Sequence, residues 1–344
     1  MKEVNIRFEY IDICKGIGII CVVLAHLGIA HRYLYMFHMP LFFFLSGMLF
    51  RRPVSSMQFI TDRAIQLLIP YIIYLTLVYS IQEYEYFKIA PITTNSIFLS
   101  TVHAILGGRW LSSYTTVFWF ITCLFFVQVC FNLLLGLFSK KKINIIILVS
   151  IVAAYINASY FAHIKFPWNI NTVLMALPVY YIGYRFKSAV MSLPFILLCF
   201  VLSAIGIALI YHGYDNYFDM KVAKYGIPIL TLSISISVTI TIILVSKKIE
   251  VVPMISNLLS RIGSASLIIM YLHQLIIIIL SQYYTSNIFI LISLSIAIPC
   301  FLYNITQNFR VTRILFLGSK KDFYDLKILS NRKLFSENES TSHL

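Results

Sequence analysis

Residues 12–47 read DICKGIGIICVVLAHLGIAHRYLYMFHMPLFFFLSG, and they decide the fold class because they set ionisable side chains inside two strongly apolar segments. An ionisable group in bilayer hydrocarbon is costly unless it is paired or lines a cavity, so such groups mark candidate functional sites. On a helix, Lys15 and His26 fall about 20° apart, and Asp12 lies within about 60° of both. This shared polar face on an apolar helix is predicted to look into the protein interior.

The composition places the chain in a lipid bilayer. Of its 344 residues, 60% are hydrophobic and only 12% are charged, whereas soluble domains carry about 25% charged residues. The apolar residues gather in runs of about 17 to 25, the length that spans a bilayer. We therefore predict an all-α, polytopic integral membrane bundle of about ten transmembrane helices. The predicted spans are 11–31, 36–50, 67–82, 117–138, 143–161, 171–186, 190–212, 226–246, 265–283 and 288–307.

The charged residues predict how these helices are oriented. The formal net charge is +14, with 27 Lys and Arg against 13 Asp and Glu, and the basic residues cluster on alternate connections. By the positive-inside rule, those connections and both termini face the cytoplasm. The basic surface suits anionic membrane lipids or an anionic cytoplasmic ligand, and nucleic acid is not expected as a partner. The predicted domain limits are 1–309 for the membrane domain and 310–344 for a cytoplasmic basic and polar tail.

Two connections contain apolar segments that are too short to span a bilayer. Residues 83–116, on the predicted outer side, include SIFLSTVHAILGG and predict a re-entrant or interfacial helix. Residues 251–264 form a similar segment on the cytoplasmic side. The polar tail is expected to be partly disordered near its end.

His26 is the strongest candidate for a catalytic group, because neutral imidazole is the usual general base near pH 7. Lys15 lies about 16 Å from it along the helix axis, so a ligand that touched both would thread into the bundle. Lys15 and Asp12 are spaced to pair with each other. The alternatives are structural. His26 would then only form a hydrogen bond to a neighbouring helix. Lys15 and Asp12 would form an ion pair at the membrane interface, with the lysine side chain extended towards water.

Further candidates lie in and around the second span. His38 precedes Pro40 at the expected start of that helix, level with His26; the alternative is that it anchors the hairpin. Ser46 and Gly47 suit close packing of helices. A set of cytoplasmic arginines could hold a polyphosphate, although topology alone accounts for them. These arginines are Arg51, Arg52, Arg63 and Arg185.

Several catalytic motifs are absent from the sequence. It contains no GxSxG, Walker loop or HExxH, which argues against an esterase, an ATPase and a zinc protease. The six cysteines show no CxxC spacing, so we expect neither a metal site nor a disulfide framework. Few carboxylates lie at mid-membrane, which disfavours proton-coupled transport.

The chain resembles the acyltransferase 3 family of bacterial membrane O-acyltransferases, and within it the fucose 4-O-acetylase-like branch. The resemblance covers about residues 10–307. The matching pieces, in order, are YIDICKGIGIICVVLAH (10–26), FHMPLFFFLSGMLF (37–50), LLIPY (67–71), VFWFITCLFF (117–126), LPVYYIGYRFK (177–187) and IGSASLIIMYLHQ (262–274).

This resemblance implies a ten-helix inner-membrane domain that transfers an acyl group, usually acetyl from acetyl-CoA, to a sugar hydroxyl of a surface polysaccharide. The family signature of a basic residue, ten residues and a histidine falls on Lys15 and His26. Many members have arginine at the first position, and lysine keeps the charge without the bidentate fork. A glutamate that another branch has after the fourth-span tryptophan is Leu124 here, so a mechanism that needs that acid cannot apply.

The implied chemistry assigns roles to the candidate residues. Acetyl-CoA is a donor substrate and no permanently bound cofactor is expected. Its phosphates would be held by Lys15 and the cytoplasmic arginines, and its thioester would reach His26. His26 would deprotonate the acceptor hydroxyl or carry the acyl group itself. His38, Trp119 or backbone N–H groups would stabilise the oxyanion.

Two other functions are compatible with the same residues. A transporter or flippase for glycan or acyl donor would use the same channel without catalysis, although the inverted repeats common in transporters are not visible. A non-catalytic membrane partner of a polysaccharide synthase is the second alternative. The expected partners are membrane lipids, acyl-CoA, a glycan or lipid-linked saccharide, and proteins of polysaccharide biosynthesis.

Overall fold

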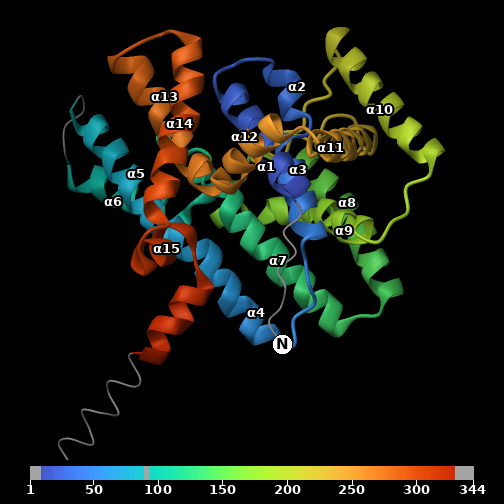
Figure 1. Ribbon diagram of the computed structural model, residues 1–344, viewed down its shortest axis with the longest axis horizontal. Coiled ribbons are helices and arrows are strands. Elements are labelled where there is room, and N and C mark those ends of the chain that lie inside the picture. The colour runs from blue at the N-terminus through green and yellow to red at the C-terminus, as the bar shows by residue number, and fades with distance from the viewer. Residues whose placement is uncertain (1–8, 89–92, 330–344) are drawn as a thin grey trace, which may run out of the picture.

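The computed structural model describes residues 9–88 and 93–329 (Figure 1). Within these residues the protein is helical, and the only strand-like pairing is an isolated bridge between Asp219 and Lys224. The prediction of an all-α bundle is therefore confirmed. The α-helices are α1 (Glu9–His26), α2 (His31–Tyr35), α3 (His38–Met48), α4 (Ser56–Arg63), α5 (Ile69–Phe87), α6 (Thr94–Leu106), α7 (Trp119–Leu137), α8 (Lys140–Tyr160), α9 (Val173–Phe186), α10 (Leu193–Tyr211), α11 (Leu230–Ile249), α12 (Pro253–Ser264), α13 (Ser266–Tyr283), α14 (Ile288–Thr306) and α15 (Arg310–Leu317).

Seven helical segments of the described chain are long and apolar enough to cross a membrane. Each overlaps one of the predicted spans, which confirms a helical membrane protein. The predicted count of about ten is not confirmed by length and composition. The seven segments are Ser56–Phe87, Ser113–Leu137, Lys140–Tyr160, Leu193–Tyr211, Leu230–Ile249, Ser266–Tyr283 and Ile288–Thr306.

The three remaining predicted spans correspond to α1, α3 and α9. Helix α1 carries Glu9, Asp12 and Lys15, whereas α3 and α9 have only 11 and 14 residues. Helix α1 ends at His26 rather than at residue 31, because Gly28 and Ala30 take positive φ values of 79° and 47° and turn the chain. The expectation of one continuous helix over 11–31 is thus wrong at its outer end.

These three helices are enclosed by other helices of the bundle. Helix α3 packs against α9, and α1 packs against α3, α11 and α12. In Figure 1, α1 and α3 lie centrally, with α5, α6, α13 and α14 on the left and α10 on the right. A helix that is enclosed by other helices does not need to match the full bilayer thickness, because its neighbours shield its ends from lipid.

A pair of glycines allows α3 and α9 to touch through their backbones. A Cβ atom on Gly47 would overlap the carbonyl oxygen of Tyr180, and a Cβ on Gly183 would overlap that of Phe44. Small residues at such crossings let membrane helices approach closely and gain packing energy. The prediction of close packing at Gly47 is therefore confirmed.

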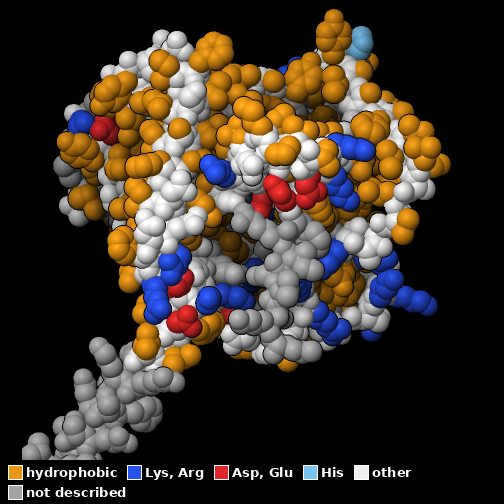
Figure 2. Space-filling view, in the orientation of Figure 1, with side chains coloured by type: hydrophobic (Ala, Val, Ile, Leu, Met, Phe, Trp, Pro, Cys, Tyr) orange, Lys and Arg blue, Asp and Glu red, His pale blue; other side chains and the backbone are white. Residues whose placement is uncertain are grey.

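Apolar side chains cover much of the protein's surface. Figure 2 shows hydrophobic side chains over the top and sides of the view, and Lys and Arg side chains mainly over its lower half and right side. Helix α6 adds exposed Ile97, Phe98 and Leu99. It is the short apolar helix that the sequence predicted within 83–116.

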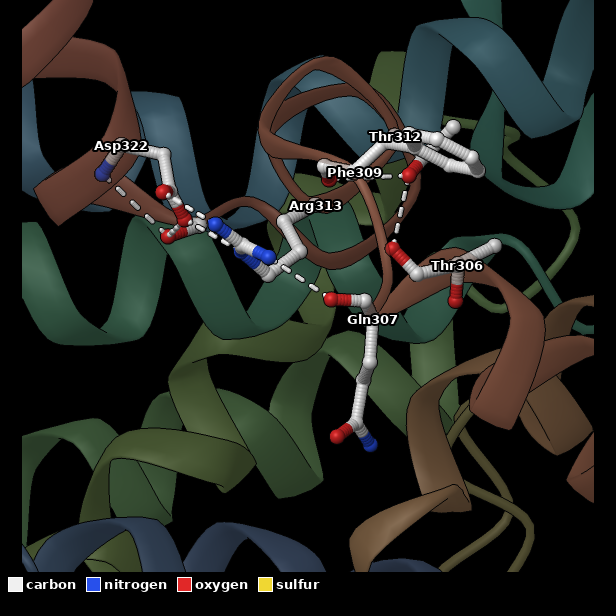
Figure 3. A network of polar contacts seen from close by, with 7 residues as sticks. Thr306, Gln307, Phe309, Thr312, Arg313 and Asp322 are labelled. Carbon is white, nitrogen blue, oxygen red and sulfur yellow. Dashed lines mark hydrogen bonds and ion pairs between the residues drawn. The ribbon is translucent and has the colours of Figure 1, made fainter.

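The described part of the C-terminal segment is helical and is clamped by ion pairs. Arg313 donates from Nε and Nη2 to the two carboxylate oxygens of Asp322, both at 2.7 Å, and from Nη1 to the carbonyl oxygen of Gln307 (Figure 3). Lys320 pairs with Asp62 of α4 at 2.7 Å. The predicted disorder near the chain end concerns residues outside the described range.

Replacement of Asp322 by asparagine is expected to loosen this segment. The Arg313 guanidinium holds the pKa of Asp322 well below its usual range, so the bidentate pair is fully formed at neutral pH and weakens only as the pH falls. Trypsin should cleave Asp322→Asn severalfold faster than the native protein within residues 310–329. Asp325→Asn, the matched control, should be cleaved at the native rate; equal rates for both variants would show that the pair is not a clamp.

Candidate active site

A cavity of about 370 Å³ lies where the ends of several helices meet three connections of the chain. We call it the outer cavity, because these connections are among those that the sequence places on the outer side. It receives His26 from the end of α1, His38 from the start of α3 and Trp119 from the start of α7. Its lining also includes Tyr35, Arg109, Lys165, Phe218, Asp219, Lys221 and Met270.

His26 is the last residue of α1 and is partly exposed to this cavity. Its ring centroid lies 5.1 Å from that of His273 on α13, with the two planes inclined by 54°. The chain turns at Gly28, directly after α1, so the imidazole of His26 lies at the end of the helix and not along its packed side. His26 is therefore placed where a ligand can reach it.

The tautomers of two other histidines follow from their hydrogen bonds. Nδ1 of His38 lies 2.7 Å from the carbonyl oxygen of Leu34, and Nδ1 of His273 lies 2.7 Å from that of Ile269. A carbonyl only accepts, so both Nδ1 atoms carry the proton and both Nε2 atoms carry a lone pair. Nε2 of His273 is buried without a hydrogen-bond partner among the described residues. His273 therefore lies behind His26 as a buried hydrogen-bond acceptor that no described residue satisfies.

The outer connections are fastened to one another by buried polar side chains. Asn169 donates to the carbonyl oxygen of Lys221, and Thr172 donates to that of Met220, each at 3.0 Å. Gly108 has φ 56°, and a Cβ there would lie 2.5 Å from the backbone nitrogen of Asn169. Only a glycine fits this approach without a shift. The cavity walls are thus fixed in position before a ligand binds.

Lys221 extends from one of these connections into the wall of the cavity. Its Nζ donates to the carbonyl oxygen of Leu111 at 3.0 Å and to Oγ1 of Thr116 at 2.6 Å. Burial is the main reason that the pKa of Lys221 is lowered to about 8; the charge of Asp219 opposes this shift, and those of Arg109 and Lys165 add to it. The ammonium is therefore charged below pH 8 and loses its charge as the pH rises through that value.

A second cavity, of about 300 Å³, is lined by residues of α1, α3, α7 and α13. We call it the inner cavity, because Arg63 in its lining belongs to the side that the sequence predicts to be cytoplasmic. Lys15 and Arg63 line it together with Gln128, whose Nε2 donates to Oγ of Ser46 at 2.8 Å. Met270 lines both the inner and the outer cavity. The two cavities are therefore neighbours, separated at this point by one flexible side chain.

The predicted polar face of α1 is divided among different surroundings. Lys15 pairs with Asp12 at 3.2 Å, as the spacing predicted. Asp12 itself lines a third cavity, of about 870 Å³, beside α12 and α14. Asp12 is buried, so it faces the protein interior as predicted. Helix α12 crosses α1 in backbone contact at Gly16 and Gly263, and Asp12 lies in a cavity that neither Lys15 nor His26 lines.

The predicted arginines are not gathered at one place. Arg63 lines the inner cavity. Arg51 and Arg52 are exposed, and Arg52 donates to the carbonyl oxygen of Leu135. Arg185 donates to the hydroxyl of Tyr181 at 3.3 Å. Of the five basic residues predicted to hold a polyphosphate, only Lys15 and Arg63 line the inner cavity.

Sequence reasoning missed three basic residues of the outer cavity, and it recognised one histidine beside the cavity without its neighbours. His273 is recognisable as a histidine in the middle of an apolar span, but its approach to His26 depends on helix packing. Arg109, Lys165 and Lys221 belong to connections that looked poor in positive charge, and they converge only through the fold. No local pattern identifies them.

This arrangement can support acid–base chemistry on a ligand bound in the outer cavity. Three imidazoles, from α1, α3 and α13, lie in or beside one cavity, and hydrogen bonds fix the tautomer of two of them. Such groups can take a proton from a hydroxyl, or one can form a covalent bond to a transferred group. Among the described residues, no cluster of His, Cys, Asp and Glu could hold a metal ion.

Comparisons with known proteins add independent information. The family model for the acyltransferase domain matches residues 8–306. Among curated proteins, the nodulation protein NolL of Mesorhizobium japonicum is 31% identical over 123 residues, and that of Sinorhizobium fredii is 31% identical over 147 residues. These alignments cover 31% and 38% of this chain, and the chain spans only 32% and 39% of the two relatives. No solved structure matches the chain.

Proposed function

The chain belongs to the acyltransferase 3 family, and we propose that it transfers acetyl from cytoplasmic acetyl-CoA to a sugar hydroxyl of a cell-surface or extracellular polysaccharide. The proposed location is the bacterial inner membrane, with both termini in the cytoplasm. Membrane lipids and proteins of polysaccharide biosynthesis are the proposed partners.

One observation carries this proposal: the two neighbouring cavities carry different chemistry. The inner cavity offers the cations Lys15 and Arg63, and the outer cavity offers His26 and His38. A donor with phosphates at one end and a thioester at the end of a long arm suits such a pair. The arm would pass Met270, which lines both cavities, and present the thioester beside His26.

The proposed reaction begins with removal of a proton from the acceptor hydroxyl by His26. The hydroxyl oxygen then attacks the thioester carbonyl carbon, and the resulting oxyanion accepts hydrogen bonds from donors in the outer cavity such as the indole N–H of Trp119. Collapse breaks the carbon–sulfur bond, and the protonated His26 returns its proton to the departing thiolate. In the alternative route, His26 attacks the thioester first and passes the acetyl group to the acceptor.

Lys15 has a role in this scheme that does not depend on a bidentate fork. Its ammonium is held by Asp12 at 3.2 Å and lines the inner cavity. A point charge at this position attracts a phosphate or polarises a carbonyl along the donor arm. Leu124 lines the same cavity, so the base in this scheme is a histidine rather than a carboxylate.

The proposed function is tested with membranes that contain the protein, labelled acetyl-CoA and the polysaccharide of the host. Label should pass into polysaccharide or lipid-linked glycan only when the protein is present. Loss of polymer export in cells that lack the protein, with unchanged acetylation of the remaining polymer, would instead indicate a transporter. Transfer by the purified protein alone would exclude a non-catalytic partner of a synthase.

A further inference from the structure

The outer cavity is cationic, although it lies on the side of the protein that the sequence predicted to be poor in positive charge. Arg109, Lys165 and Lys221 line it, and among the described residues Asp219 is the one carboxylate in its lining. In the described part of the chain, none of the three cations forms an ion pair with a carboxylate. The cavity therefore holds more positive than negative charge before a ligand binds.

The cations retain hydrogen-bond donors for a ligand. An ammonium has three N–H donors, and Lys221 uses two of them, to Leu111 and Thr116. Arg109 bonds the carbonyl oxygens of Ala162 and Ile164 through Nη1 alone, which leaves Nε and Nη2 of its guanidinium. Arg109 and Lys221 are half-buried, whereas Lys165 is exposed. Partial burial makes an unpaired cation costly, so an anion beside Arg109 and Lys221 would be favoured.

Aromatic rings line the same cavity beside these charges. The ring of Tyr35 stacks on that of Tyr217, with centroids 4.9 Å apart and planes inclined by 9°. Tyr35, Trp119 and Phe218 all contribute to the lining. Flat, rigid rings offer a surface for the apolar C–H face of a sugar. The cavity volume is also within the range of small-ligand sites, whose volumes start at about 300 Å³.

We propose that the acceptor is an anionic glycan, and that Arg109, Lys165 and Lys221 bind a carboxylate or phosphate group on the sugar that is acylated. The inference rests on the proposed function and names the substrate class of the same site. The acidic group is held by the outer connections, the sugar ring lies over the aromatic side chains, and one hydroxyl reaches His26. Because Asn169 and Thr172 fix the backbone at Lys221 and Met220, little ordering is needed on binding.

The first test measures binding without any acyl donor. The full-length protein in lipid nanodiscs is titrated with a trisaccharide containing glucuronate, with its carboxyl-reduced glucose counterpart, and with a hexose phosphate. The glucuronate or phosphate ligand should bind at least tenfold more tightly than the neutral one, and Lys221→Gln and Arg109→Gln should each remove about tenfold of that affinity. The anionic ligand that binds more tightly shows whether the site recognises a carboxylate or a phosphate group.

Matched variants separate this effect from misfolding. Lys224→Gln removes the same charge from an exposed position of the same connection and should leave binding unchanged. Lys221→Arg keeps the charge and should retain the preference for the anionic ligand. Equal affinity of the native protein for the charged and neutral sugars would overturn the proposal, as would equal losses for both ligands in Lys221→Gln.

A second test separates this inference from the proposed function. With acetyl-CoA supplied, transfer to the anionic sugar should have a KM at least tenfold lower than transfer to the neutral one. Transfer to both sugars with the same KM would overturn the anionic acceptor and leave the acetyltransferase standing. Selective binding of the anionic sugar without transfer from any acyl-CoA would overturn the proposed function and leave an anionic glycan site.

Discussion

His26→Ala is expected to lower the rate of acyl transfer by at least about 100-fold while the protein still folds and enters the membrane. A positioned general base contributes about 10²- to 10⁴-fold, and an acyl-carrying nucleophile would be lost altogether. His26 is partly exposed to the outer cavity and is the last residue of its helix. Its removal therefore leaves the hydrogen bonds of α1 intact.

A matched control and a kinetic distinction make this prediction specific. His212 is an exposed histidine on the same predicted outer side, and His212→Ala should keep the native rate. A labelled acyl-protein that forms in the native enzyme and loses its label in acid is expected only if His26 carries the acetyl group during the reaction. A His26→Ala protein with normal yield and a native transfer rate would remove His26 from the mechanism.

Gly183→Leu is expected to be the most damaging single substitution for the fold. Even a Cβ at this position overlaps the carbonyl oxygen of Phe44, and a leucine would force α9 away from α3. Overpacking a tight core costs about 1–3 kcal/mol, and separating two helices in backbone contact should cost at least the upper end of that range. The loss extends to the site, because His38 begins α3 and the Asn169–Thr172 anchors directly precede α9.

The comparison for this prediction is another helical glycine. Gly136 on α7 is exposed, and a Cβ there would meet nothing within 4 Å. In a thermal unfolding experiment on detergent-solubilised protein, Gly183→Leu should melt many degrees below the native protein or yield no folded protein. Gly136→Leu should melt close to the native temperature; a similar melting temperature for both variants would refute the close α3–α9 contact.

The sequence predicts the helical membrane architecture and the family well, because both are recorded in local patterns. Long apolar runs identify the spanning helices, and the histidine and basic residue of the first span identify the family. Gly47 signals a close crossing because a small residue has few other uses in an apolar helix. His26 and His38 line one cavity because both lie at helix ends joined by a short connection.

The parts that the sequence predicts poorly depend on contacts between distant segments. The projection of Asp12, Lys15 and His26 onto one helical face is geometrically correct, yet α12 crosses that helix and places Asp12 in a separate cavity. The convergence of Arg109 and Lys221 depends on hydrogen bonds between connections far apart in the chain. Neither periodicity nor charge patterning contains that information.

The central claim, that acetyl crosses from a cytoplasmic donor to an acceptor on the other side, is tested most directly by the sidedness of the reaction. The purified protein would be placed in sealed vesicles with a polysaccharide acceptor inside and labelled acetyl-CoA added outside. For molecules whose predicted cytoplasmic face points outward, label should accumulate on the enclosed acceptor, and this should cease with His26→Ala. Label that appears only when donor and acceptor share one compartment would contradict transfer through the two neighbouring cavities.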